Sequence, residues 1–262
     1  MSALYLDERI VHYEVLGRGR PVIFLHGWLG SWRYWLPAMQ TTSVSFRAYA
    51  LDLWGFGNTS RDPERYTIEQ QAALLESFLQ RLGIAKVALI GHGLGGLVSI
   101  LFTHNFPETV DRVMLVDCPL DISAVHSRLG TASPADLTDW LLEKNAVTEP
   151  ARIEAPKADP QAILTSLKGL NGAGFKPMLK RMSIPCLLVH GQNDLVITAP
   201  DNDRLESLPA HFHQVVLEQS GHFPMLDESA RFNRLLTDFL ALVSGESPRQ
   251  LQLKEEWKRR VR

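Results

Sequence analysis

The stretch GHGLGG at residues 91–96 decides how the rest of the chain is interpreted. It lies between an apolar run at residues 86–90 and a helix-like run at residues 97–106, which predicts a sharp turn from a buried strand into a helix. Such a turn holds its central residue above the sheet at a strained, positive φ, and a nucleophilic Ser, Cys or Asp is expected there. The central residue here is Gly93, which relieves the strain and supplies no nucleophile.

Short apolar runs that look like buried strands recur along the chain. Their apolarity is continuous, which indicates strands covered on both faces, as in a parallel sheet. The clearest helical pattern covers residues 68–82, where Thr67 and Gln70 predict a capping box and Gly83 a stop. Alternation at residues 10–15 predicts an antiparallel hairpin leading into the sheet. The predicted strands cover residues 22–25, 48–51, 87–90, 113–116, 186–189 and 215–217. We therefore expect an α/β fold with a mostly parallel, doubly wound sheet.

One segment interrupts this alternation of strands and helices. Residues 121–183 show no strand pattern, while residues 135–144 and 161–168 look helical between prolines. Because the segment follows a predicted strand, it is expected over the carboxyl ends of the strands, where open α/β sheets bind ligands. We expect a helical cap or lid there, with the core formed by residues 1–120 and 184–245. A helical excursion that merely packs is the alternative.

Composition argues against several partners. The formal net charge of -2 and the pI of about 6.5 provide no basic field for nucleic acid or an anionic membrane. No apolar run approaches the ~20 residues that span a bilayer, and the N-terminal residues lack the apolar core of a signal peptide. A cytoplasmic protein is therefore expected. Cys118 and Cys186 are expected as buried residues at opposite ends of the sheet, too far apart to bridge.

The C-terminal tail, residues 246–262, is treated separately from the core. Residues 254–262 contain five basic and two acidic residues around Trp257. A solvated terminal helix or frayed end is expected, with a partner-docking segment as the alternative.

Five segments together resemble the α/β-hydrolase family, and the resemblance spans nearly the whole chain. Each follows a predicted strand, in the order that this family shows. The segments are HGWLGS at 26–31, DLWGFGNTS at 52–60, GHGLGG at 91–96, GQND at 191–194 and SGHFPMLDES at 220–229. The resemblance implies an α/β-hydrolase fold with a helical cap and a chemistry of the carboxylic-ester or C–C hydrolase type.

The resemblance also implies a catalytic constellation that lacks one member. In this family the nucleophile, acid and base follow one another as Ser, Asp or Glu, and His. Asp194 is similar to the acid that orients the imidazole, and His222 is similar to the base. Asp117, at a neighbouring strand end, is a second candidate for the acid and ranks behind Asp194. Gly93 occupies the nucleophile position.

The oxyanion hole and ligand pocket follow from the same resemblance. Its donors are expected to be the backbone N–H groups of Trp28 and Leu94, which do not depend on side-chain identity. The aromatic residues Trp28, Trp32, Trp35 and Phe223 are expected near the pocket mouth and predict a small, apolar carbonyl or ester ligand. Asp52, in the turn DLWGFGNTS, is expected to be structural. The histidines show no metal-binding spacing, so neither a metal nor a cofactor is expected.

Three functions are compatible with these residues. The favoured one is a scaffold without a nucleophile, inactive as a serine hydrolase, that binds a small apolar carbonyl or ester compound. The second is an active hydrolase, lyase or cofactor-free oxygenase that uses Asp194 and His222 as a general base. The third is an ordinary hydrolase whose serine was replaced by Gly93 in an engineered variant.

Overall fold

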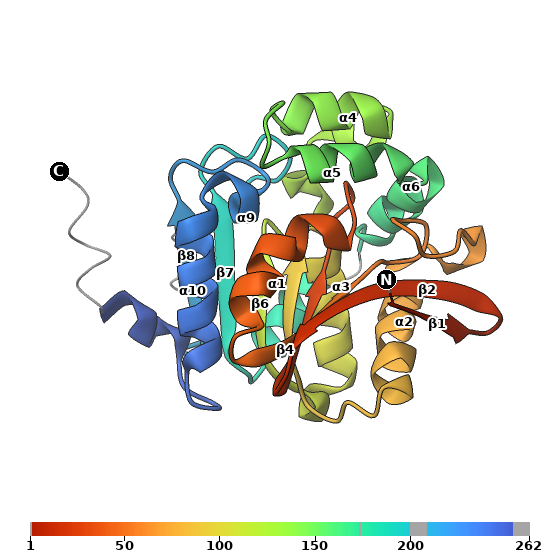
Figure 1. The fold of residues 1–262 in the computed structure, drawn as a ribbon. Helices are drawn as coiled ribbons and strands as arrows, with labels where there is room; N and C mark the ends of the chain where they lie inside the picture. The colour runs from red at the N-terminus through yellow and green to blue at the C-terminus, as the bar shows by residue number, and fades with distance from the viewer. Residues whose placement is uncertain (1, 173, 200–208, 254–262) are drawn as a thin grey trace.

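The computed structural model describes residues 2–172, 174–199 and 209–253. Within these residues, eight strands form one sheet in the order β1-β2-β4-β3-β5-β6-β7-β8 (Figure 1). β2 pairs antiparallel with β1 and with β4, and the other neighbours are parallel. The strands are β1 Ser2–Leu6, β2 Arg9–Gly17, β3 Arg20–Leu25, β4 Phe46–Leu51, β5 Val87–His92, β6 Val110–Val116, β7 Cys186–Gly191 and β8 Phe212–Leu217. The predicted fold class is confirmed, and each predicted strand lies inside an observed one.

Helices alternate with the parallel strands and pack in two groups. α1 packs against α10, and α3 packs against α2 and α7. The helices are α1 Leu36–Thr42, α2 Ile68–Arg81, α3 Leu94–Asn105, α4 Pro134–Leu141, α5 Glu149–Glu154, α6 Pro160–Gly169, α7 Phe175–Arg181, α9 Pro224–Asp227 and α10 Ser229–Ala241. The short 3-10 helices are η1 Trp32–Trp35, η2 Pro63–Arg65, η3 Pro107–Thr109, η4 Ile122–Ala124, η5 Ser127–Gly130, η6 Ala155–Lys157 and η7 Pro248–Leu253.

Helix α2 shows why the local sequence signals work. The Thr67 side chain accepts a hydrogen bond from the backbone N–H of Gln70, which satisfies one donor of the first turn. The helix ends before Gly83, whose φ of 65° is a conformation that glycine adopts without strain. The predicted start and stop are therefore both observed.

The strands at the centre of the sheet are buried from end to end. Every residue of β5 is buried, as is every residue of β7, which explains their continuous apolar sequences. Cys118 follows β6 and Cys186 begins β7, and both are buried and free, as expected. This rigid sheet positions the loops that follow its strands.

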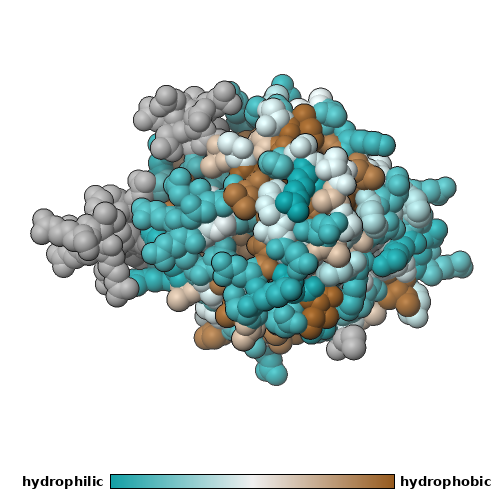
Figure 2. Space-filling model, turned by 90° about the horizontal axis from the view of Figure 1, so that it is seen from above, coloured by the Kyte–Doolittle hydropathy of each residue, from teal (hydrophilic) through white to brown (hydrophobic). Residues whose placement is uncertain are grey.

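Residues 121–183, apart from residue 173, contain the helices α4 to α7 and no strand longer than an isolated bridge between Val125 and Ile197. Figure 1 shows α4, α5 and α6 together at the top of the molecule. Viewed from above, this end presents small, separate apolar patches among hydrophilic residues (Figure 2). The N–H of Asp159 donates to the carbonyl of Gly55 across 2.9 Å, so this segment contacts a loop at the carboxyl ends of the strands.

Two sequence-based expectations concern the ends of the chain and membranes. In the tail, residues 248–253 form η7, and the basic segment at 254–262 lies outside the described residues. Among the described residues, no helix combines the length and apolarity needed to cross a bilayer.

Candidate active site

The turn from β5 into α3 has the geometry that the sequence predicts. Gly93 adopts φ 49° and ψ −110°, a region that disfavours any residue with a side chain. Its N–H donates to the carbonyl of Val116 across 2.9 Å. A Cβ at Gly95 would lie only 2.3 Å from the carbonyl oxygen of Leu25, so α3 passes too close to β3 for any other residue.

Asp194 and His222 meet although 28 residues separate them. The loops after β7 and β8 bring His222 Nδ1 to 2.8 Å from Asp194 Oδ2. Asp194 Oδ1 accepts the N–H groups of Val196 at 2.7 Å and Ile197 at 3.1 Å. Burial opposes ionisation of Asp194, but His222 and these N–H donors outweigh it and lower the pKa of the carboxyl. The pair has the arrangement of an acid that orients a base; its role in catalysis stays a prediction.

Asp117 lies beside this pair in a different state. It adopts a φ of 41°, and its Oδ1 accepts the N–H of Gly191 across 3.0 Å. Complete burial, with the charge of Asp194 added, raises the pKa of Asp117 well above its usual value. A neutral carboxyl cannot stabilise a charged imidazole as a carboxylate does, so the geometry favours Asp194 as the partner of His222.

The two backbone amides expected to form an oxyanion hole are available. The N–H groups of Trp28 and Leu94 donate to no acceptor among the described residues. The loop that holds Trp28 is fixed by a chain of hydrogen bonds: the N–H of Gly27 donates to Tyr34 Oη at 2.7 Å, and Tyr34 Oη lies 2.8 Å from His92 Nδ1. Tyr34 was not among the predicted site residues.

Burial keeps both partners of the second hydrogen bond in this chain uncharged. Burial raises the pKa of Tyr34 and lowers the pKa of His92 well below its usual value. The Tyr34 hydroxyl therefore keeps its proton, and it shares one hydrogen bond with the neutral ring of His92. That ring packs 4.6 Å from the ring of His222, measured between centroids, so the loop, the turn and the base support one another.

The indole of Trp28 occupies the space above Gly93. A Cβ at position 93 would lie 3.2 Å from indole atoms Cε3 and Cζ3. Trp28 is fully buried, and its Nε1–H donates to Ser166 Oγ of α6 across 2.9 Å. Nothing in the local sequence indicates this contact, because the two residues are 138 positions apart.

The other aromatic residues expected at a pocket mouth are buried instead. Trp35 packs in the core against Phe24 and Phe232, with ring centroids 5.2 Å and 6.2 Å apart. Phe223 is 1% exposed and packs on the rings of Tyr34 and His222. Only Trp28 of this predicted group lies over the nucleophile position.

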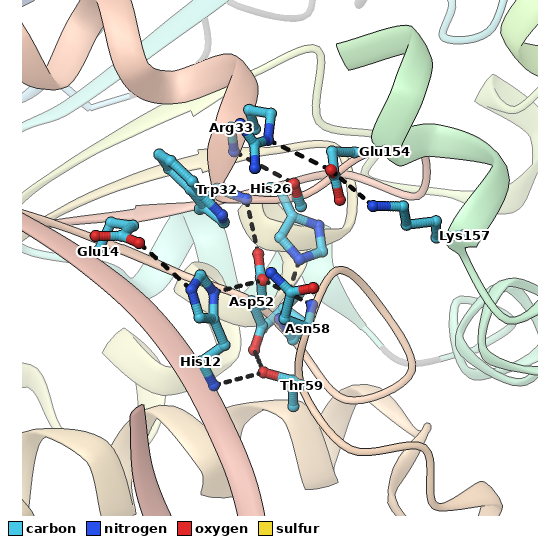
Figure 3. Close-up of polar contacts among 12 residues, drawn as sticks. His12, Glu14, His26, Trp32, Arg33, Asp52, Asn58, Thr59, Glu154 and Lys157 are labelled. Atoms are coloured by element: carbon cyan, nitrogen blue, oxygen red, sulfur yellow. Dashed lines mark hydrogen bonds and ion pairs between the residues drawn. The ribbon is translucent and has the colours of Figure 1, made fainter. Parts of the chain in front are cut away.

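A second buried histidine–aspartate pair joins strand β2 to the loop after β4. Asp52 is fully buried and accepts hydrogen bonds from His12 Nδ1 at 2.8 Å, from the N–H of Trp32 at 2.7 Å and from the N–H of Asn58 at 3.0 Å (Figure 3). The other ring nitrogen of His12 lies 3.5 Å from Glu14. These contacts tie the loops after β3 and β4 to β2, so Asp52 is structural, as expected.

One group of side chains has the composition of a metal site. His92, Asp117 and His222 offer ligand atoms within 4.8 Å of one another. Donor atoms on a tetrahedral zinc lie about 3.3 Å apart, given zinc–nitrogen bonds of about 2.0–2.1 Å. The hydrogen bonds at Nδ1 leave only the Nε2 atoms of His92 and His222 for an ion, and the raised pKa of Asp117 disfavours a carboxylate ligand. We therefore assign no ion to this group.

Known proteins share both the sequence pattern and the fold. RutD of Enterobacter cloacae, named as a carbamate hydrolase, is 29% identical over 88% of this chain and 95% of its own. The pimeloyl-[acyl-carrier protein] methyl ester esterase of Vibrio cholerae is 24% identical over 87% of this chain and 97% of its own. A Ser-to-Gly variant of the N-acyl homoserine lactonase AidH, solved with N-hexanoyl homoserine lactone, superposes with a TM-score of 0.74 at 19% identity, covering 91% and 96% of the two chains.

The family model described as "Alpha/beta hydrolase family" matches residues 22–235, a range that contains the Gly93 turn, Asp194 and His222. Together with the sheet order and the site geometry, this match shows that the chain belongs to the α/β-hydrolase family.

Proposed function

We propose that this protein binds a small apolar carbonyl or ester compound and does not act as a serine hydrolase. The observation that carries the proposal is Gly93, in the nucleophile conformation but without a side chain, beside a formed Asp194–His222 pair. Without a hydroxyl or thiol at this position no covalent acyl intermediate forms. Loss of the nucleophile from a triad costs about 10⁶-fold in rate.

Ligand binding does not depend on the missing hydroxyl. The N–H groups of Trp28 and Leu94 are buried donors that a carbonyl oxygen satisfies, and leaving them unpaired costs about 1–3 kcal/mol each. The AidH variant, in which a serine is likewise replaced by glycine, was solved with a lactone bound. The names of the relatives mention a carbamate and a methyl ester, which are compounds with a carbonyl group. In this proposal residues 121–183 cover the ligand as a lid.

The retained Asp194–His222 pair favours a second candidate, an enzyme that uses His222 as a general base toward water or an acidic substrate proton. A positioned base contributes about 10²–10⁴-fold to a rate. His222→Ala separates the two candidates: in the second, slow turnover of esters, lactones or diketones disappears while binding of a substrate analogue persists. Turnover that is indifferent to His222 removes this candidate.

A serine-reactive fluorophosphonate probe tests the main proposal on the unmodified protein and on Gly93→Ser. We expect no labelling of the former and labelling of the latter, because the amides and the Asp194–His222 pair are already in place. Direct binding of an ester, lactone and diketone panel to the unmodified protein is measured in parallel by calorimetry. Labelling of the unmodified protein that requires His222 contradicts the missing nucleophile, and a panel without any binder contradicts the ligand-binding role.

A further inference from the structure

The space above Gly93 is filled by part of the protein itself. The indole of Trp28 lies at the distance of a tight contact from the position that a nucleophile's Cβ would take. Any molecule that reaches the amides of Trp28 and Leu94 next to this position must therefore share or take the space of that ring. A ligand that takes this space should therefore be flat and about the size of the indole.

The hydrogen bond from the indole to Ser166 defines a second requirement for such a ligand, which is a hydrogen-bond donor. Ser166 Oγ donates its own proton within α6, toward the carbonyls of Ala162 at 2.7 Å and Ile163 at 3.0 Å. Toward Trp28 it acts only as an acceptor, and it receives the indole N–H. Ser166 is fully buried, so removal of the indole without replacement leaves a buried acceptor short of a partner.

We propose that Trp28 is a built-in occupant of the ligand subsite and that the ligand displaces its indole. The fitting ligand is a flat aromatic carbonyl compound: its carbonyl oxygen accepts from the amides of Trp28 and Leu94, its ring lies over Gly93, and a ring N–H or O–H donates to Ser166 Oγ. This inference rests on the proposed function and specifies its ligand class. It also explains the presence of glycine at position 93, since a side chain there meets the indole at 3.2 Å.

The probe is 3-acetylindole, which combines a carbonyl with a ring N–H, and calorimetry measures its affinity. Its control compound is 1-methyl-3-acetylindole, which lacks the N–H. We expect Trp28→Ala to bind 3-acetylindole at least about tenfold more tightly than the unmodified protein, because no indole has to be displaced and an apolar cavity is open. Trp28→Leu serves as a second variant if Trp28→Ala does not fold. Trp54→Phe, in the loop after β4 against Arg65, is the matched control and leaves the affinity unchanged.

The contact with Ser166 is tested separately. In Trp28→Ala the N-methyl compound binds about threefold to tenfold more weakly than 3-acetylindole, as expected for loss of one hydrogen bond. Adding Ser166→Ala abolishes this difference between the two compounds. A preference that survives in the double variant shows that another acceptor receives the N–H and overturns the assignment of Ser166.

Displacement is observed directly in the unmodified protein. The chain has six tryptophans, and Trp28→Phe identifies the indole N–H resonance of Trp28 in an ¹⁵N spectrum. Saturating 3-acetylindole must shift this resonance more than the other tryptophan signals. If compounds of the carbonyl panel bind but neither this resonance nor the Trp28 variants respond, the inference fails while the proposed function stands. If no compound binds any folded variant, the proposed function itself fails.

Discussion

Two buried histidine–aspartate pairs of the described residues are hydrogen-bonded, and they differ in their surroundings rather than in their contact. His12 Nδ1 lies 2.8 Å from Asp52 Oδ2, and His222 Nδ1 lies 2.8 Å from Asp194 Oδ2. Both carboxylates also accept two backbone N–H groups. His12, however, sits within strand β2 with Glu14 at its other nitrogen, whereas His222 follows β8 and packs on His92 beside the Gly93 turn. A buried His–Asp pair by itself therefore indicates stability as readily as catalysis, and what distinguishes the second pair is its contact with His92 beside the Gly93 turn.

The largest expected effect tests this contrast through stability. His12→Ala removes a buried ring and leaves the buried carboxylate of Asp52 short of one hydrogen-bond partner, which lowers the free energy of unfolding by about 3–5 kcal/mol. His222→Ala is expected to cost less, about 1–2 kcal/mol, because site residues are positioned for chemistry or binding at the expense of stability. Urea unfolding of both variants measures the difference. Equal losses would show that the two pairs contribute alike to stability and would break the contrast.

A second expectation concerns a buried histidine that has no carboxylate hydrogen bond. Neither ring nitrogen of His190 has a hydrogen-bond partner among the described residues, although Nδ1 lies 3.6 Å from Asp117 Oδ1, and burial lowers its pKa to about 4. In the unfolded chain this histidine has a pKa of about 6.5, so it is protonated there at a higher pH than in the folded protein. Stability therefore falls as the pH drops from about 6.5 to about 4. The contribution is at most about 3 kcal/mol. The free energy of unfolding should change less with pH across this range in His190→Gln than in the unmodified protein. An unchanged pH dependence excludes His190 as its cause.

The nucleophile position is expected to have a smaller effect. Gly93→Ala places a Cβ at φ 49° and 3.2 Å from the indole of Trp28, which costs about 1–3 kcal/mol. Gly83→Ala is the matched control, because it has a φ of 65° but nothing within 4 Å of the added carbon. Its cost of about 1–2 kcal/mol represents the backbone conformation alone. Denaturant unfolding that shows Gly93→Ala to be neutral contradicts the strained turn.

The smallest effect concerns the outer end of the structural pair. Glu14→Gln removes the charge 3.5 Å from His12 Nε2 but leaves the contact with Asp52 intact. We expect a loss of about 0–1 kcal/mol, measured by thermal unfolding. A loss as large as that of His12→Ala would shift the structural role from the carboxylate of Asp52 to that of Glu14.

Features that depend on residues close together in the sequence could be predicted, and contacts between distant segments could not. Strands and the caps of α2 depend on neighbouring residues, so they were readable from apolar runs and from Thr67 and Gly83. The contact between Asp194 and His222 could be expected from the family resemblance, because each follows a strand in a motif of its own, while their catalytic role stays a prediction. The Trp28–Ser166 contact and the Tyr34–His92 hydrogen bond were not readable, since they depend on how separate segments pack. For the same reason Trp35, expected near the pocket mouth, is a core residue.

The glycines of GHGLGG leave unequal room for a side chain. A Cβ at Gly91 would lie 2.3 Å from the carbonyl oxygen of Gly95, and a Cβ at Gly96 would lie 2.6 Å from Cys118 Sγ. Backbone closes the first of these positions, as it closes Gly95, whereas position 93 faces only the 3.2 Å contact of a side chain and the 3.5 Å contact of Gly27 Cα. A serine at position 93 therefore needs accommodation from the indole of Trp28 and incurs the strain of φ 49°, but no backbone atom lies closer than 3.5 Å to its Cβ.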